Sequence, residues 1–199
     1  MSDRTGPRDA EFARKALHLS MAVVPIAWAS GVVSHEQVRI GVAVLAITAV
    51  IAEGARLRLA RVHQAIERLA GPLLRPHEHR AITGATWLAI GCAVAVFAFP
   101  SRAAISALWA VTVGDALAAL VGQLISPQVG ERKRKTIAGS VTCLVASALG
   151  AWWLAGATPL AALAIGAAAA VAERPHAGVN DNVRIVAAAG LAAWVLGVA

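Results

Sequence analysis

The stretch VTVGDALAALVGQLISPQVGERKRKTIAGS, residues Val111–Ser140, joins an apolar run to a basic cluster. Asp115 lies inside the apolar run, and the basic residues Arg132–Lys135 follow about one helix length later. A carboxylate is costly inside a membrane segment and is usually retained because a cation uses it. The basic loop continues into hydroxyl and glycine residues that suit phosphate binding: Thr136, Gly139 and Ser140. This stretch predicts a carboxylate-bearing membrane helix followed by a phosphate-binding loop.

The composition of the whole chain is typical of a membrane protein. Of its 199 residues, 58% are hydrophobic and only 15% are charged, with a mean hydropathy of +0.68. A soluble domain carries about 25% charged residues. The length corresponds to a single domain. We therefore predict one all-α, membrane-embedded domain over residues 1–199.

Seven apolar segments approach the length needed to cross a bilayer. They are Ala16–Val33, Val38–Ala52, Ala81–Phe99, Ala103–Ile125, Ile137–Gly156, Leu160–Ala172 and Arg184–Val198. With a cytoplasmic N-terminus, nearly all Lys and Arg fall on the cytoplasmic side, as the positive-inside rule requires. We therefore predict a multi-pass protein of about seven transmembrane helices in the inner (plasma) membrane, with residues 1–13 as a cytoplasmic tail. A cleaved signal peptide over Ala16–Ser30 is the alternative, which the six later segments disfavour.

The net charge of +7 would favour nucleic acid as a partner if the protein were soluble. Here the basic residues are spread over connections next to membrane segments, and no nucleic-acid-binding module is recognisable. We expect anionic lipid headgroups as partners and no nucleic acid. Cys92 and Cys143 both fall in apolar segments, so they predict neither a disulfide framework nor a metal motif.

The connection at residues 57–75 has the pattern of an amphipathic helix. Apolar residues recur at alternating three- and four-residue spacing: Leu59, Val62, Ile66, Leu69 and Leu73. The arginines of this connection fall off the apolar stripe, and a Gly71-Pro72 pair ends it. We expect an interfacial helix with its arginines toward anionic lipid. The alternative is a solvated extension of the preceding segment.

Asp115 is expected to point into the bundle. It lies beside Gly114, Ala118 and Gly122, a small-residue face that favours close packing against a neighbouring helix. A carboxylate placed there could hold Mg²⁺, with Glu173 and Asp181 completing the metal site from the two ends of one cytoplasmic loop. The alternatives are a structural ion pair of Asp115 with an arginine from another helix, and a helix cap for the Asn180–Asn182 run.

Other polar groups fall at the same membrane face. They are Arg14, Lys15 and His18 near the start, Glu53 and Arg56 after the second segment, and Thr83 and Thr86 before the third. We expect these groups to converge on one site. For the basic loop at residues 126–136, the alternative is a plain topology signal that binds anionic headgroups.

In this order, the motifs resemble the polyprenol kinase family, which includes dolichol kinases, phytol kinases and CTP-dependent diacylglycerol kinases. The matching motifs are E-x-x-R-K-x-x-H at Glu11–His18, E-x-x-R at Glu53–Arg56, G-A-T-x-L-x-x-G at Gly84–Gly91, GDALAALVG at Gly114–Gly122, KTIAGS at Lys135–Ser140 and the Glu173 to Asn182 loop. The chain departs from the family at Ala138, where a glutamate is usual.

The resemblance implies Mg²⁺-dependent phosphorylation of a lipid alcohol such as phytol, geranylgeraniol, a polyprenol or diacylglycerol, with CTP (or ATP) as donor. Asp115, Lys135 and Asp181 would be catalytic, and Asp115, Glu173 and Asp181 would hold the metal. The nucleotide would contact Arg132, Lys133, Arg134, Lys135, Thr136, Gly139, Ser140 and Asn182, with Arg14, Lys15, His18, Glu53, Arg56, Thr83 and Thr86 as further contacts.

Two other functions stay open at this point. GDALAALVG and KTIAGS are also similar to the membrane core of CTP:phosphatidate cytidylyltransferases, which attach CMP to a phospholipid. A transporter or lipid-binding scaffold, with Asp115 coupling protons, is the non-enzymatic alternative. The small-residue helix faces also permit a homodimer.

Overall fold

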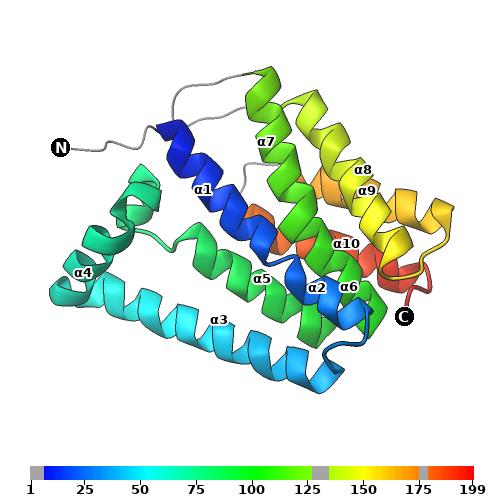
Figure 1. Cartoon of the computed structure of the whole chain (residues 1–199), viewed down its shortest axis with the longest axis horizontal. Coiled ribbons are helices and arrows are strands. Elements are labelled where there is room, and N and C mark those ends of the chain that lie inside the picture. Colours follow the sequence, from blue (N-terminus) through cyan, green and yellow to red (C-terminus); the bar gives the residue numbers. More distant parts are fainter. Residues whose placement is uncertain (1–6, 127–134, 175–178) are drawn as a thin grey trace.

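The computed structural model describes residues 7–126, 135–174 and 179–199, which form helices and connecting turns without a β-strand. The predicted all-α class is confirmed. The elements are α1 Pro7–Ser20, α2 Val23–Ala29, α3 His35–Arg58, α4 Ala60–Ala70, η1 Gly71–Leu73, η2 Pro76–His79, α5 Gly84–Ala98, α6 Ser101–Trp109, η3 Ala110–Gly114, α7 Asp115–Ile125, α8 Ile137–Trp153, α9 Pro159–Glu173 and α10 Asp181–Val195 (Figure 1).

The bundle is built around helices rich in alanine and glycine. α8 packs between α7 and α9, while α10 packs against α9, α6 and α5. α1 runs beside α7, α3 lies against α5, and α4 extends from the end of α3 (Figure 1). The core consists mostly of small and branched apolar side chains, among them Ala103, Leu108, Ile165 and Ile185. Small side chains allow helices to approach closely, which brings chain segments far apart in the sequence to one end of the bundle.

Polar side chains mark where helices begin. Ser34 and Gln37 form a reciprocal capping box at the start of α3. The capping alternative for the Asn180–Asn182 run is confirmed, because Asn180 Oδ1 accepts from the backbone N–H of Asn182 at 3.0 Å. Threonine caps three further helices, at Thr83, Thr136 and Thr158.

The first predicted segment, Ala16–Val33, is not a single helix. α1 ends at Ser20 and α2 begins at Val23, because Pro25 has no N–H to bond the carbonyl of Met21. That carbonyl accepts from Val24 N–H instead, at 3.1 Å. α1 begins at Pro7, within the predicted cytoplasmic tail 1–13, whose location relative to the membrane stays a prediction.

A separate helix forms within the predicted interfacial segment 57–75, but it is shorter than predicted. α4 covers Ala60–Ala70 and is followed by the one-turn helix η1 at Gly71. Leu59 has an extended backbone (φ −112°, ψ 111°) and separates α4 from α3. α4 is therefore not continuous with α3, and its place at the membrane interface stays a prediction.

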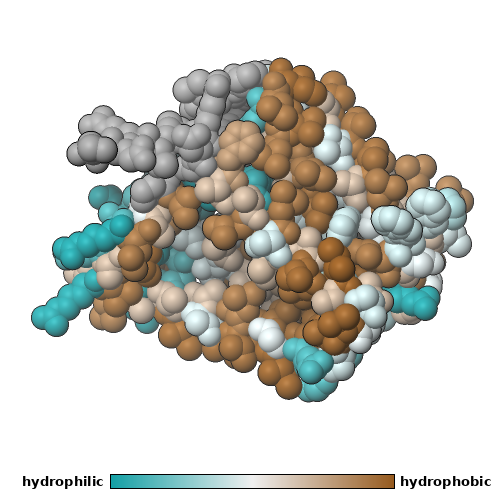
Figure 2. Space-filling view, in the orientation of Figure 1, coloured by the Kyte–Doolittle hydropathy of each residue, from teal (hydrophilic) through white to brown (hydrophobic). Residues whose placement is uncertain are grey.

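Two of the described helices are long and apolar enough to cross a membrane, judged by length and composition alone. They are His35–Arg58, whose apolar face is largely exposed, and the continuous helix Ser101–Ile125, which is mostly buried within the bundle. Figure 2 shows hydrophobic residues over much of one face of the molecule. Three other apolar helices, α5, α8 and α9, are only 15, 17 and 15 residues long. The seven-span arrangement therefore stays a prediction.

The predicted small-residue face of α7 packs against α8. A Cβ added at Gly114 would lie 2.3 Å from Ser147 Oγ, and one at Gly122 would lie 3.0 Å from Thr136 Oγ1. Since real Cβ atoms do not approach other atoms to 2.3 Å, a side chain at position 114 would require Ser147 Oγ to move.

Gly166→Ala is expected to lower the free energy of unfolding by about 1–3 kcal/mol, the usual cost of overpacking. The added Cβ would lie 2.3 Å from the backbone carbonyl oxygen of Leu144, which cannot rotate away as a side chain can. Gly41→Ala is the matched control, because no described atom outside its own helix lies within 4 Å of its added Cβ. The control should gain about 0.5–1 kcal/mol from helix propensity. Unfolding of both variants in detergent would measure the effect, and a stabilised Gly166→Ala would contradict it.

Candidate functional site

Asp115 is the first residue of α7 and follows a five-residue π-helical segment, η3. Its side chain is buried, with a residue exposure of 2%. π-helical turns are rare and often occur at functional sites, since the extra residue changes which side chains point inward. The prediction that Asp115 points into the bundle is confirmed.

Lys15 of α1 is the hydrogen-bond partner of Asp115. Its Nζ donates to Asp115 Oδ2 at 2.6 Å, and only 8% of Lys15 is exposed. His18, one helical turn later, places Nδ1 at 3.7 Å from the same oxygen. The structural-pair alternative for Asp115 is thus present, with a lysine as the partner where an arginine was expected.

Lys135 lies among three carboxylates. Its Nζ is 2.9 Å from Glu173 Oε1, 3.5 Å from Asp181 Oδ2 and 4.0 Å from Asp115 Oδ1. Burial by itself lowers the pKa of Lys135, but the three carboxylates outweigh it and raise that pKa above its ordinary value. Lys135 is therefore charged at every physiological pH.

These contacts define the lysine–carboxylate cluster. Its members are Lys15, His18, Asp115, Lys135, Glu173 and Asp181. Lys15 and His18 belong to α1, and Asp115 is the first residue of α7. Lys135 precedes the cap of α8, Glu173 ends α9 and Asp181 begins α10. These parts of the chain meet in the folded bundle.

Of the polar groups predicted to converge on one site, Lys15 and His18 join this cluster. The prediction is wrong for the others, whose described contacts lie elsewhere: Arg14, Glu53, Arg56, Thr83 and Thr86.

Two oxygens of the cluster are left without a hydrogen-bond donor. Asp115 Oδ1 and Glu173 Oε2 are buried and have no hydrogen-bond partner among the described residues. Buried carboxylate oxygens without donors suit a hard cation such as Mg²⁺, which takes one or two carboxylates and completes its shell with phosphate and water. Within the described ranges, however, no three His, Cys, Asp or Glu side chains are grouped closely enough to hold a metal. The Mg²⁺ set of Asp115, Glu173 and Asp181 stays a prediction.

The residues after Lys135 form the start of α8. Thr136 Oγ1 accepts from the backbone N–H of Gly139 at 3.0 Å, and Gly139 lies so close to α7 that an added Cβ would be 2.8 Å from Ala118 O. Ser140 Oγ is buried without a described hydrogen-bond partner. Thr136 thus caps α8, and Gly139 allows α8 to pack closely against α7. Their predicted contacts with a nucleotide stay predictions. The predicted nucleotide contacts Arg132, Lys133 and Arg134 lie outside the described residues.

Four other predicted residues meet in a second group, the glutamate–arginine clasp: Glu53, Arg56, Thr83 and Thr86. One oxygen of Glu53 accepts from Arg56 and the other accepts from Thr83 and Thr86, at 2.8 and 2.7 Å. Arg56 also donates to two backbone carbonyls, of His79 and Ala81. These bonds hold α3, α5 and the segment between them together. A nucleotide contact from this group stays a prediction.

Two predicted residues connect the site to its surroundings. Asn182 Nδ2 donates to the carbonyl of Gly84 at 3.2 Å, which ties α10 to the start of α5. Arg14 pairs with Glu11 and donates to Leu73 O at 2.9 Å. Among the described contacts, Arg14 therefore braces α1 against η1.

Sequence analysis missed Glu78, which is 4% exposed. Its two oxygens accept from the backbone N–H groups of Arg75 and Gly84, both at 2.8 Å. The carboxylate thereby shapes the connection that leads into α5. A Pro followed two residues later by Glu is a helix-start signal, so the sequence RPHEH at residues 75–79 did carry a clue.

No protein-family model, curated protein or solved structure matches the chain. The resemblance to polyprenol kinases thus rests on the motifs named above.

Proposed function

We propose that this chain is a membrane-bound lipid-alcohol kinase of the polyprenol kinase type. It would transfer the γ-phosphoryl group of CTP, or of another nucleoside triphosphate, to an isoprenoid alcohol or to diacylglycerol. The observation that supports this proposal is the lysine–carboxylate cluster, which gathers three carboxylates and two lysines from distant segments at one end of an apolar bundle. Phosphoryl transfer depends on positioning and charge, and both signs of charge are needed.

The chain's own residues would act mainly by electrostatics. Lys15 and Lys135 now neutralise the carboxylates, and in the loaded site their ammonium groups would donate to donor phosphate oxygens instead. Asp115, with its free buried Oδ1, and Glu173, with its free buried Oε2, would hold Mg²⁺ together with Asp181. The metal would supply charge neutralisation on the phosphates. No covalent intermediate is required.

The placement of tryptophan supports a membrane setting. Trp152, Trp153 and Trp194 are more than half exposed and lie near the C-terminal ends of α8 and α10. The cluster residues Lys135 and Asp181 stand at the N-terminal ends of the same two helices. Exposed tryptophan is enriched at membrane–water interfaces, and Lys and Arg at the cytoplasmic side. The cluster would therefore face the cytoplasm.

Two single-cysteine substitutions test this topology. Val32→Cys lies in the turn before α3, and Ser126→Cys lies just after α7. The native Cys92 and Cys143 are buried and should give little background with a membrane-impermeant maleimide. In sealed vesicles of known orientation, Ser126→Cys should react only from the cytoplasmic side and Val32→Cys only from the outer side. Labelling of both from the same side would contradict the proposed topology.

The activity is tested with purified protein, Mg²⁺ and CTP labelled separately at the γ- and α-phosphates. The acceptors are geranylgeraniol, phytol, undecaprenol, diacylglycerol and phosphatidic acid. Transfer of γ-label to an alcohol would establish the kinase, whereas α-label on phosphatidic acid would establish a cytidylyltransferase. The absence of transfer from both CTP and ATP would rule out both enzymes.

Lys135→Ala is expected to lower turnover by about 10²–10³-fold, the usual effect of removing one group that stabilises transition-state charge. The matched control is Arg102→Ala, which removes an exposed cation in the first turn of α6 and should leave turnover unchanged. The transporter alternative makes the opposite prediction, because Lys135 would then only set topology and its loss would leave transport intact.

A further inference from the structure

The lysine–carboxylate cluster is accessible on one side and covered on the other. The side chains of Lys135 and Asp181 are 25% and 35% exposed, whereas that of Asp115 is 3% exposed. Helix α1 provides the cover, because Lys15 Nζ lies 2.6 Å and His18 Nδ1 lies 3.7 Å from Asp115 Oδ2. A ligand at the exposed side can therefore contact Lys135, but it does not reach the Asp115 oxygen that Lys15 holds.

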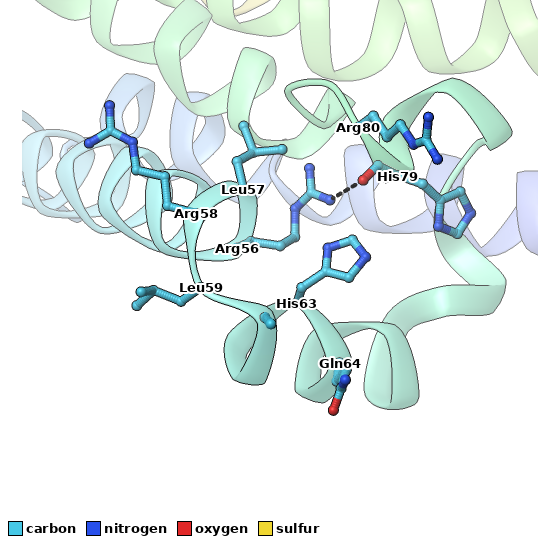
Figure 3. Close-up of a pocket in the computed structure, with 9 residues that line it drawn as sticks. Arg56, Leu57, Arg58, Leu59, His63, Gln64, His79 and Arg80 are labelled. Atoms are coloured by element: carbon cyan, nitrogen blue, oxygen red, sulfur yellow. Dashed lines mark hydrogen bonds between the residues drawn. The ribbon is translucent and has the colours of Figure 1, made fainter.

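Two cavities within the described residues lie elsewhere. Figure 3 shows the one at the α3–α4 corner, whose lining includes Arg56 and His63. The other is an apolar groove between α8 and α9, where Leu144 and Trp152 are among the lining residues. No member of the cluster lines either cavity. Access to Asp115 therefore requires that an element around the cluster moves.

Charged side chains, rather than apolar ones, hold α1 against the bundle. Between Glu11 and Ser20 the buried residues are Glu11 and Lys15, while the large apolar side chains of Phe12 and Leu17 are 44% and 59% exposed. The helices that carry the other cluster residues, α7 to α10, each bury apolar side chains. Elements with few buried apolar contacts open at a low free energy, and active-site lids are drawn from them. α1 is therefore the element around the cluster that moves most easily.

A break in helical hydrogen bonding joins α1 to the rest of the bundle. The N–H groups of Met21 and Ala22 donate to carbonyls three residues earlier, as in a tight turn, and not four residues earlier as in an α-helix. Beyond the break, α2 is anchored by Pro25 and Trp28, which are buried. The turn at Met21 and Ala22 is thus a joint between a weakly held helix and a fixed one.

The bond between Lys15 and Asp115 is the buried attachment of α1. The other described attachments lie near η1, where Arg14 donates to a backbone carbonyl and Arg75 pairs with Glu11 at 3.4 Å. The side chain of Arg75 is 42% exposed, and exposed ion pairs stabilise a structure only slightly. Loss of the Lys15–Asp115 bond should therefore be enough to release α1.

We propose that α1 is a gate over the inner half of the cluster, and that the ion pair of Lys15 with Asp115 is its latch. When α1 turns about Met21 and Ala22, it withdraws Lys15 and His18 from Asp115 and exposes the carboxylate. The inference rests on the proposed function for the ligand that opens the gate, a phosphate that competes with Asp115 for the Lys15 ammonium group. Such a ligand shifts the population toward the open form, because Lys15 is available to it only there.

The test measures the distance between two spin labels on the full chain in uncharged detergent. One label is at Ala13→Cys on the exposed side of α1, and the other is at Leu160→Cys at the start of α9. The native cysteines are buried and should stay unlabelled. Lys15→Ala should add a second distance component, because opening lets water reach the Asp115 carboxylate that has lost its donor. Ala13 lies about 12 Å from the joint at about 1.5 Å per residue, so a turn of about 30° shifts the distance by about 6 Å.

Controls separate the gate from a general loosening of the bundle. The pair Val44→Cys and Leu160→Cys, on α3 and α9, should keep its distance in Lys15→Ala. Lys15→Gln keeps an N–H donor at this position, so it should show less of the second component, and it keeps the test decisive if Lys15→Ala does not fold. An unchanged distance from Ala13 to Leu160 in Lys15→Ala, or an equal shift of the control pair in both Lys15 variants, would overturn the proposal.

Phosphate ligands distinguish the gate from the proposed function. Inorganic triphosphate, and CTP with Mg²⁺, should each produce the second component in the chain with native Lys15. A second component in Lys15→Ala but with neither ligand would support the gate and count against the proposed phosphotransfer.

Discussion

Asp115→Asn is expected to lower the turnover of the proposed phosphotransfer and to lower the free energy of unfolding by about 3–5 kcal/mol, the cost of breaking a buried ion pair from one side. The variant leaves Lys15 buried with a neutral partner where a carboxylate now accepts its hydrogen bond at 2.6 Å. Lys135 also loses one of the three carboxylates around it. The loss of turnover should be at least about 10³-fold, because a group that acts on developing charge is removed.

A double-mutant cycle separates the ion pair from other effects of Asp115→Asn. Lys15→Met alone should also destabilise, since it leaves Asp115 Oδ2 without its donor. The double variant should lose less stability than the sum of the two single variants, because no uncompensated charge then stays buried. Additive losses, measured by unfolding in detergent, would show that Lys15 and Asp115 are not coupled.

Asp181→Asn distinguishes activity from stability within the same cluster. The Asp181 side chain is 35% exposed, and its contact with Lys135 is 3.5 Å long. Exposed ion pairs contribute about 0–1 kcal/mol, so the stability of Asp181→Asn should stay close to that of the native chain. Its turnover should still fall if Asp181 belongs to the catalytic group. Full activity with native stability would remove Asp181 from the proposed site.

Glu53→Gln is expected to destabilise the protein by about 3–5 kcal/mol, for the same physical reason at a different place. Arg56 is 2% exposed, and Glu53 is the carboxylate that pairs with it. The substitution removes the negative charge and replaces one acceptor oxygen by an NH₂ group. That group would face either the Arg56 guanidinium or the two threonine hydroxyls, which now donate to Glu53.

The matched control is Glu36→Gln, which makes the same chemical change on the same helix. Glu36 is exposed in the first turn of α3, where it contributes only a favourable interaction with the helix dipole, about 0.3–1 kcal/mol. Thermal unfolding of both variants should therefore show a large shift for position 53 and a small one for position 36. Equal shifts in the two variants would mean that Glu53 stabilises the protein no more than the exposed Glu36 does.

Much of this architecture could be predicted from residue type and spacing. The apolar runs indicate helices, and four-residue spacing of Gly114, Ala118 and Gly122 indicates a close helix contact, as α7 and α8 confirm. The break between α1 and α2 was not predicted, although Pro25 is visible in the sequence. The prediction of one segment rested on mean hydropathy, which does not register the single backbone N–H that a proline lacks. The seven-span arrangement and the kinase function stay predictions.

Two features of the site depend on packing and leave no local signal. The π-helical turn before Asp115, AVTVG, is apolar like much of its α-helical flanks, so hydropathy does not distinguish it from them. The partner of Asp115 is Lys15, one hundred positions earlier in the chain. The chain has 18 lysines and arginines, and residue spacing in the sequence does not indicate which of them pairs with Asp115.

Composition and periodicity of this chain determine that it forms apolar helices and that most of its charges fall outside the apolar runs, with Asp115 as an exception. Those properties are local, because each depends on a residue and on neighbours within a few positions. The tertiary structure decides which charges meet: Lys15 and Lys135 with Asp115, Glu173 and Asp181 in one group, Arg56 with Glu53 in another, and Arg58 and Arg80 with no described carboxylate. The physical reason is that burying a charge is favourable only with a partner at hydrogen-bond distance, and helix packing sets that distance.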